Sequence, residues 1–223
     1  MRKDDRTPLY AKYLIRLTRP FPDFDFFFIK PLRKKATGLL MLKPGDRVID
    51  MGCGMGGSFP YLVNAVGPTG EVVGVEISPD VIINAKKRIA LNNWTNIIVV
   101  EAPAQTVGLT GMFNGLLMFG APDAYASEEA LENIIPYLKD NSCVVIFGAK
   151  GANNFIGKIL NPILNKVFSK LTFATTPGMS AEPWQILSKY VNNITIKEYF
   201  FGWMFLASGS VISSTVINKA QLE

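Results

Sequence analysis

Histidine does not occur anywhere in the 223 residues of the sequence. It is the side chain that most often acts as a general base near neutral pH, and it is the commonest metal ligand. Its absence excludes hydrolases built on Ser-His-Asp or Cys-His arrangements and zinc enzymes whose metal is held by histidine. We therefore expect no metal site and a reaction that needs no imidazole.

Cysteine and charge are also scarce. The two cysteines, Cys53 and Cys143, provide neither a disulfide framework nor the spacing of a metal site. Charged residues make up 18% of the chain and hydrophobic residues 48%, which indicates a folded domain rather than disorder. A chain of this length can bury one large core, so a single α/β domain is expected.

The sequence lacks a clear secretory signal or membrane helix. Its N-terminal residues are charged and contain no continuous apolar core. Residues 199–218 carry no charge, but Ser208-Gly209-Ser210 interrupts them. This favours the end of one strand, a connection and a second strand over a bilayer span. The sequence predicts a cytoplasmic protein and leaves open a peripheral contact with a membrane.

The formal charge of +5 is unevenly distributed. Residues 1–35 hold ten basic and four acidic side chains, and residues 150–181 hold four lysines and no acid. Such zones are usually solvated surface, but they also suit an anionic membrane. Nucleic acid is not expected as the partner, because the neighbouring phenylalanine and isoleucine residues suit acyl chains better than phosphates.

Short apolar strands alternate with helices along most of the chain. The expected strands are residues 47–51, 71–77, 97–101, 115–119 and 143–149, and the expected helices are 9–19, 31–41, 58–65, 79–92 and 127–138. Ser58 is expected to cap its helix through its side chain. The alternation predicts a doubly wound, mostly parallel sheet that is covered by helices on both faces.

A glycine-rich loop follows the first of these strands, at Gly52-x-Gly54-x-x-Gly57. Open α/β sheets bind ligands at such strand-to-helix turns, and this spacing also fits dinucleotide enzymes. Asp50, two residues earlier, would repel a pyrophosphate but would attract a ligand with an amino group and a sulfonium. Glu76, at the tip of the second strand, can accept hydrogen bonds from ribose hydroxyls in either class.

Residues 42–56, which read LKPGDRVIDMGCGMG, and 66–78, which read VGPTGEVVGVEIS, resemble the first two motifs of class I S-adenosylmethionine-dependent methyltransferases. The resemblance implies a seven-stranded Rossmann-like sheet whose last strand is reversed, with residues 209–217 as the candidate for that strand. It implies S-adenosylmethionine as cofactor, S-adenosylhomocysteine as product, and these cofactor-binding residues: Asp50, Gly52, Cys53, Gly54, Gly56, Glu76, Ile77, Ala104, Gln105 and Phe119.

The resemblance is closest to the small-molecule and lipid-type branch, because Lys30-Pro31-Leu32-Arg33 precedes the fold as the N-terminal helices of that branch do. It divides the chain into an N-terminal helical lid or substrate segment, residues 1–41, and a methyltransferase domain, residues 42–223. A helical insertion is expected at about 152–181. Gln105, or the backbone at Ala104, stands where the family usually has an acidic residue near the adenine amine.

Methyl transfer from a sulfonium mainly requires that a nucleophile be positioned and water excluded. No catalytic residue can be assigned; the side chains that could remove a proton are Tyr10, Tyr13, Asp25, Asp123 and Tyr125. The segments expected to border the acceptor are apolar, which favours a hydrophobic small molecule or a lipid headgroup. The alternatives are an NAD(P)-dependent oxidoreductase and a non-catalytic cofactor-binding member of the same fold.

Overall fold

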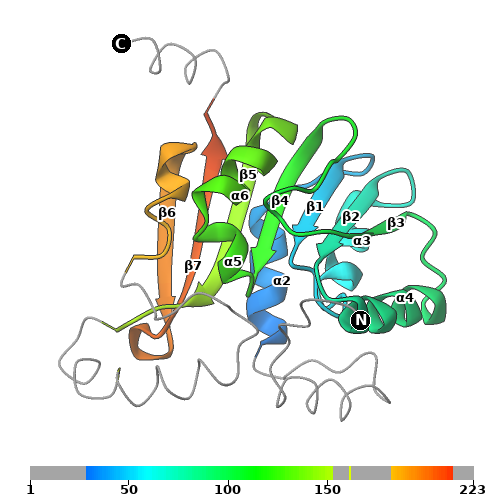
Figure 1. The fold of residues 1–223 in the computed structure, drawn as a ribbon, viewed down its shortest axis with the longest axis horizontal. Coiled ribbons are helices and arrows are strands. Elements are labelled where there is room, and N and C mark those ends of the chain that lie inside the picture. Colours follow the sequence, from blue (N-terminus) through cyan, green and yellow to red (C-terminus); the bar gives the residue numbers. More distant parts are fainter. Residues whose placement is uncertain (1–28, 153–160, 162–181, 213–223) are drawn as a thin grey trace, which may run out of the picture.

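The computed structural model describes residues 29–152, 161 and 182–212 (Figure 1). The helix expected at 9–19 and nearly all of the insertion expected at 152–181 lie outside these residues. Within them, no helix is long and apolar enough to cross a membrane.

The described chain forms one seven-stranded sheet in the order β3-β2-β1-β4-β5-β7-β6 (Figure 1). Its strands are β1 (Arg47–Met51), β2 (Glu71–Glu76), β3 (Ile97–Glu101), β4 (Phe113–Phe119), β5 (Leu138–Ala149), β6 (Val191–Tyr199) and β7 (Met204–Val211). Strands β1 to β5 pair in parallel, and β7 runs antiparallel to both β5 and β6. The mostly parallel sheet with a reversed last strand is therefore confirmed.

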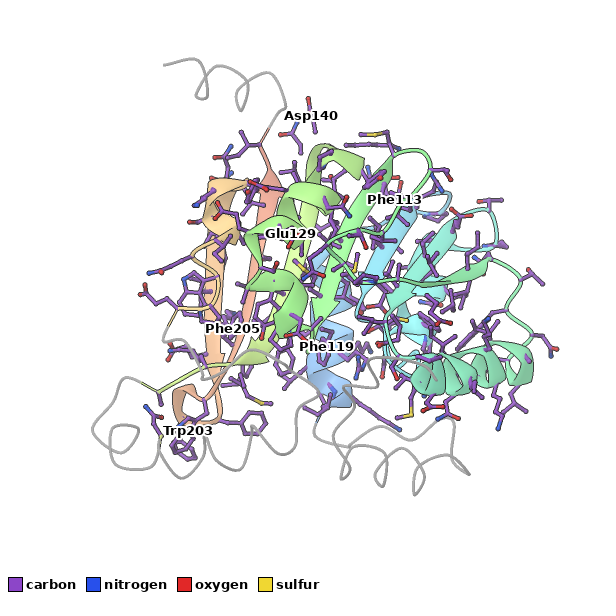
Figure 2. All side chains as sticks on the ribbon, viewed as in Figure 1. Phe113, Phe119, Glu129, Asp140, Trp203 and Phe205 are labelled. Atoms are coloured by element: carbon purple, nitrogen blue, oxygen red, sulfur yellow. The ribbon has the colours of Figure 1, made fainter. Side chains whose placement is uncertain are left out.

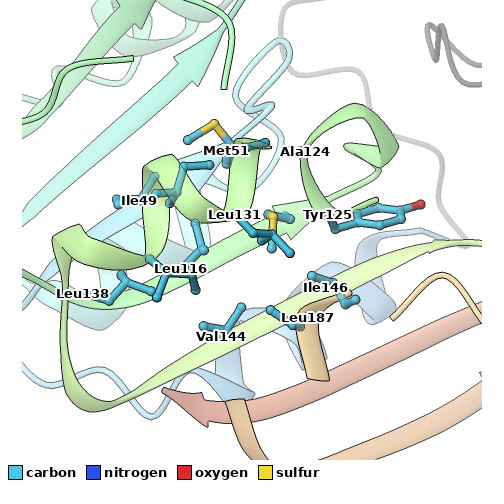
Figure 3. Packing of buried hydrophobic residues seen from close by; sticks show 14 of the residues in the cluster. Ile49, Met51, Leu116, Ala124, Tyr125, Leu131, Leu138, Val144, Ile146 and Leu187 are labelled. Carbon is cyan, nitrogen blue, oxygen red and sulfur yellow. The ribbon is translucent and has the colours of Figure 1, made fainter. Parts of the chain in front are cut away.

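Helices cover both faces of this sheet. They are α2 (Lys30–Leu39), α3 (Phe59–Val66), α4 (Pro79–Leu91), α5 (Pro122–Tyr125) and α6 (Glu128–Ile134), with short 3-10 turns η1 (Ile135–Tyr137), η2 (Leu187–Lys189) and η3 (Phe200–Gly202). Figure 3 shows the first face, where Leu131 of α6 packs over Leu116 and Val144 of the sheet. On the second face, Leu32 and Ala36 of α2 are buried with side chains of α3, β4 and β5. Helix α2 is thus part of the core.

The reversed strand begins earlier in the chain than the sequence predicted. Residues 209–217 were expected, but β7 spans Met204–Val211 and ends soon after the Ser-Gly-Ser segment that was taken as a break. The small residues instead allow close packing within the sheet. A Cβ on Gly209 would lie 2.7 Å from a methyl carbon of Val191. Gly209 also pairs with Val144 of β5, so the segment is strand rather than connection.

The position of Lys150 in the acid-free zone suggested that it belongs to a solvated basic surface. The structure shows that it does not. It follows β5 directly, is only 1% exposed, and forms an ion pair with Glu198 of β6. Its ammonium also lies 5.6 Å from the ring centroid of Trp184. A buried cation needs such a partner, so this pair ties the end of β5 to the outer strand. The other lysines of that zone lie outside the described residues.

Candidate functional site

The carboxyl ends of β1 to β5 lie along one edge of the sheet, which we call the ligand edge. The strand order reverses between β1 and β4, and ligands of doubly wound sheets bind at such a switch point. Residues 52–57 follow β1 at this edge, and Phe119 ends the neighbouring β4 (Figure 2). The first strand and the glycine loop are therefore placed as the sequence predicted.

The glycine loop needs glycine for backbone and for packing reasons. Gly52, Gly54 and Gly56 have φ angles of 68°, 56° and 76°, in the left-handed region that favours glycine. A Cβ on Gly52 would also lie only 2.5 Å from the Cβ of Ala121, which follows β4. The loop thus lies directly against the segment after β4.

Four amides of this loop are engaged within the protein. Gly52 and Cys53 donate to the carbonyl oxygen of Val75, at 2.8 and 3.0 Å, and Gly56 donates to the carbonyl of Cys53 at 3.0 Å. Gly54 donates to Oε2 of Glu76 at 3.1 Å. A loop that cradles phosphates directs its amides at the ligand. This arrangement does not suit a pyrophosphate.

Asp50 is a buried carboxylate at the end of β1. It is 1% exposed, and its Oδ2 atom has no hydrogen-bond partner. Burial raises the pKa of Asp50 to about 7; the charge of Arg33 and a hydrogen bond from Ser58 act in the opposite direction, while Glu76 adds to the rise. An unsatisfied buried carboxylate is costly. A cationic group of a ligand would satisfy it.

Arg33 reaches this carboxylate from α2. Its Nη1 atom donates to Oγ of Ser58 at 3.0 Å, and its guanidinium carbon lies 4.2 Å from the ring centroid of Phe119. A Cβ on Gly57 would lie 2.8 Å from the same guanidinium. Arg33 therefore lies between the glycine loop and β4. The sequence did not single out Arg33, because its contact with the site depends on how α2 packs against the glycine loop and β4.

The hydroxyl of Ser58 has a different role from the one expected. Ser58 precedes α3, but its side chain makes no capping hydrogen bond. It instead accepts the hydrogen bond from Arg33 and hydrogen-bonds Asp50. These three side chains form one polar network, in which Asp50 and Ser58 are buried and Arg33 is half-buried.

Glu76 lies at the tip of β2, as predicted. Its Oε1 accepts hydrogen bonds from the amides of Ile77 and Ser78, both at 2.9 Å, and its Oε2 accepts the one from Gly54. Burial raises the pKa of Glu76, and these hydrogen bonds lower it. Each carboxylate oxygen has two acceptor positions, so Oε2 retains one. Ile77, next in the chain, is 64% exposed and offers an apolar surface beside it.

Cys53 and Phe119 are turned largely into the core. A Cβ on Gly74 would lie 2.9 Å from Sγ of Cys53, and burial raises the pKa of that thiol well above its ordinary value. Cys53 therefore offers no thiolate to the site. The ring of Phe119 stacks on Phe147 with centroids 4.3 Å apart and lies against Arg33 on its other side.

Ala104 and Gln105 follow β3 and are held toward α5 and α6. The carboxamide nitrogen of Gln105 lies 3.2 Å from the carbonyl oxygen of Asp123 and 3.4 Å from Oγ of Ser127. The carbonyl of Ala104 accepts a hydrogen bond from Asn133 at 2.9 Å. These contacts fix the segment that borders the site on the β3 side.

Of the side chains considered as bases, Asp123 and Tyr125 lie within the described residues. Tyr125 is 3% exposed, its ring centroid lies 5.8 Å from that of Phe205, and burial raises the pKa of its phenol above the ordinary value. It is therefore not a base near neutral pH. Asp123 opens α5, and Tyr10, Tyr13 and Asp25 lie outside the described residues. The structure describes no cluster of three metal-ligating side chains in the ranges it covers.

The ligand edge suits a ligand with three features. These are a cationic group that would lie at Asp50, hydroxyl groups that would lie at Glu76, and a flat apolar group that would lie at Ile77. S-adenosylmethionine combines these features, and the sheet topology is that of class I methyltransferases. The chain belongs to the methyltransferase domain family, which it matches over residues 42–172. It is a class I S-adenosylmethionine-dependent methyltransferase. This family decides against the alternative of an NAD(P)-dependent oxidoreductase.

Known proteins resemble the chain over most of its length. A demethylmenaquinone methyltransferase from Bacillus cytotoxicus is 23% identical over 192 residues, which cover 78% of this chain and 81% of that one. A demethylmenaquinone methyltransferase from Lactobacillus johnsonii is 27% identical over 176 residues, covering 74% and 70%. The structure of the N-methyltransferase NodS from Bradyrhizobium japonicum with S-adenosylhomocysteine superposes with a TM-score of 0.64 at 11% identity, covering 93% and 99%, and so shares the fold.

Proposed function

We propose that this enzyme methylates a hydrophobic small molecule of the quinone type, with the cofactor held at the ligand edge between β1 and β4. The observation that carries the cofactor site is the buried Oδ2 atom of Asp50, which lacks a partner beside a loop whose amides are turned inward. The two relatives named above are demethylmenaquinone methyltransferases, which supports a quinone-type acceptor.

The bound cofactor supplies a methyl group that its sulfonium has already activated. We assign Asp50 to the cationic amino-acid end of this ligand and Arg33 to its carboxylate, because the two side chains lie in one network through Ser58. Gly52, Gly54 and Gly56 allow close approach of the backbone, with Cys53 between them. Glu76 would accept a ribose hydroxyl through the free position on Oε2. A contact with both ribose hydroxyls requires Glu76 to release one of the three backbone amide hydrogen bonds that it accepts.

The adenine would lie between Ile77 and the segment that holds Ala104 and Gln105. Ile77 offers exposed apolar area on one side. On the other side the backbone is fixed through Asn133, so it can present donors and acceptors to the ring at little entropic cost. Phe119 serves as a support for Arg33 more than as a direct contact, since both its ring faces are already covered.

The acceptor side is aromatic at the ends of β4 and β5. Phe119 and Phe147 stack there, and the hydroxyl of Tyr125 lies so close to Gly148 that a Cβ on this glycine would be 2.1 Å from it. These three side chains are buried, so they do not contact the acceptor themselves. They form an apolar, water-excluding base at this end of the sheet, which is what an in-line displacement needs from the protein.

The acceptor is tested with purified protein, labelled S-adenosylmethionine and a short-chain demethylmenaquinol, with products identified by mass spectrometry. We expect a methylated naphthoquinol that carries the label. Asp50→Asn should lower the rate at limiting cofactor by roughly tenfold or more, because a charge-assisted contact is lost. Asp80→Asn, which removes an exposed carboxylate at the start of α4, should have no effect. Methylation of phosphatidylethanolamine but not of the quinol would reassign the acceptor to a lipid headgroup.

Arg33→Met is expected to weaken S-adenosylhomocysteine binding by roughly ten- to a hundredfold, since a charge-assisted hydrogen bond contributes about 1.5–3 kcal/mol. Methionine keeps the length of the side chain but removes its charge. Lys34→Met, one residue further along the same helix and exposed, is the matched control and should leave the affinity unchanged. Calorimetric titration measures both variants. Equal affinities for the two would show that Arg33 does not contact the cofactor.

A further inference from the structure

The turn between β6 and β7 holds two phenylalanines in a strained backbone conformation. Phe200 and Phe201 have φ angles of 50° and 58°, in the left-handed region that bulky side chains rarely adopt. They are 46% and 78% exposed. Strain of this kind persists where the surrounding structure imposes it, and it is concentrated at functional positions. Exposed aromatic area held in a strained turn therefore calls for a functional explanation.

This turn lies on the ligand edge. Met204 at the start of β7 pairs with Ala149 at the end of β5, so the turn that precedes β7 lies beside the carboxyl ends of the parallel strands. Figure 2 shows Trp203 on the same rim of the sheet as Phe119, with Asp140 on the opposite rim. The rings of Phe201 and Trp203 contact each other, with centroids 6.4 Å apart.

Exposed lysines of α2 lie on the same rim, where Arg33 of this helix contacts Phe119. Lys30, Lys34 and Lys35 of α2 are exposed, and α2 contains no acidic residue. The ammonium of Lys35 lies 5.4 Å from the ring centroid of Tyr199, the residue directly before Phe200. The N-terminal part of α2 and the β6–β7 turn thus form one surface, which we call the rim surface: Lys30, Lys34, Lys35, Phe200, Phe201 and Trp203.

We propose that the rim surface docks on an anionic lipid bilayer. Phenylalanine and tryptophan side chains insert at the level of the headgroups, and lysines beside them are attracted to anionic phosphates. The other large hydrophobic residues exposed in the described ranges are aliphatic and do not adjoin one another in sequence. Single exposed residues of that kind are ordinary surface. Within the described residues, the rim surface instead combines exposed aromatic rings with three lysines of a helix that contains no acid.

Docking at this rim would bring the acceptor side of the enzyme to the membrane. If the proposed quinone-type acceptor is correct, the substrate could pass from the bilayer to the ends of β4 and β5 without crossing water. The consequence for the substrate rests on the proposed function. The docking itself does not, because it depends only on the charge and exposure of the rim surface.

Vesicle co-sedimentation of the full chain tests the proposal, with vesicles of phosphatidylcholine alone or mixed with phosphatidylglycerol. We expect binding that rises with the anionic fraction and falls with added salt. Lys34→Glu combined with Lys35→Glu should weaken binding by about tenfold or more. Lys86→Glu combined with Lys87→Glu, the same charge change on the exposed side of α4, should weaken it much less.

The aromatic part is tested by Phe200→Asn combined with Phe201→Asn. Asparagine tolerates the left-handed conformation, so this variant should fold at least as well as the parent while binding vesicles roughly tenfold more weakly. Leu91→Asn combined with Met112→Asn removes exposed apolar area elsewhere and should not change vesicle binding. All variants should keep their affinity for S-adenosylhomocysteine and their activity on a short-chain quinol without lipid.

Failure of the wild-type chain to bind anionic vesicles at low salt would overturn the proposal. So would equal losses in the rim variants and their controls. Neither result would affect the proposed function, whose cofactor and acceptor assays contain no membrane. Conversely, vesicle binding that depends on the rim surface in a chain that methylates no quinol would contradict the proposed acceptor alone.

Discussion

Asp50→Asn is expected to weaken S-adenosylmethionine binding by about ten- to a hundredfold at pH 8 and, at the same pH, to make the cofactor-free protein more stable. Both effects come from the same buried carboxylate. Its charge attracts the cationic ligand, but without a ligand its Oδ2 atom has no hydrogen-bond partner. Asparagine is nearly the same size and carries no charge, so it removes the cost of burying the charge together with the attraction.

The pH dependence of this stabilisation has a definite sign. Burial raises the pKa of Asp50 from 3.8 to about 7 in the folded protein, so the folded state holds a proton that the unfolded state releases between these values. The unfolding free energy of the wild type should therefore fall, relative to Asp50→Asn, as the pH rises from about 4 to 7. The pKa difference corresponds to a loss on the order of 4 kcal/mol.

Urea unfolding of both proteins at pH 5 and pH 8 measures this difference. The advantage of Asp50→Asn should be larger at pH 8 than at pH 5, and Asp80→Asn should show no such change. Cofactor binding near pH 6 should also release protons, because the bound cation favours the ionised carboxylate. A wild type that is as stable as Asp50→Asn at pH 8 would show that the carboxylate is not buried without a partner.

Gly52→Ala is expected to lower the unfolding free energy by about 2–5 kcal/mol and to abolish tight cofactor binding. Two effects add. A non-glycine residue in the left-handed region costs roughly 1–2 kcal/mol, and overpacking costs about 1–3 kcal/mol. The new methyl group would lie 2.5 Å from the Cβ of Ala121, so the loop or the segment after β4 must move.

Gly54→Ala is the matched control for this second prediction. Gly54 has a φ of 56°, but a Cβ there would meet no atom within 4 Å. It should therefore lose only about 1–2 kcal/mol, the cost of the backbone conformation. Urea unfolding compares the two variants. If both lose the same amount, the contact between the glycine loop and Ala121 does not contribute to stability.

Local patterns predicted the parts of the fold that depend on neighbouring residues. Strands β1 and β3 have the predicted limits, because each is a short apolar run between turn residues. The reversed strand was placed late, because Ser208 to Ser210 are common in turns and their role here depends on Val191, which comes from another strand. Packing between distant segments is not visible in local sequence.

The same distinction applies to the candidate site. Asp50 and Glu76 could be located from sequence because both lie at the ends of predicted strands. Arg33 could not, since its place beside Asp50 depends on how α2 packs across the sheet, 17 positions away in the sequence from the residue it approaches. Ser58 was recognised as the residue before a helix, but its hydrogen bond to Arg33 also required the position of α2. The cluster arises from tertiary packing.

Calorimetric titration with S-adenosylhomocysteine and, separately, with NADH tests the central claim most directly. The site should bind one S-adenosylhomocysteine per chain, and Asp50→Asn and Glu76→Ala should each weaken this binding by about ten- to a hundredfold. NADH should not bind or compete. Saturable binding of NADH, or S-adenosylhomocysteine binding that both variants leave unchanged in a folded protein, would contradict a cofactor site built on Asp50 and Glu76.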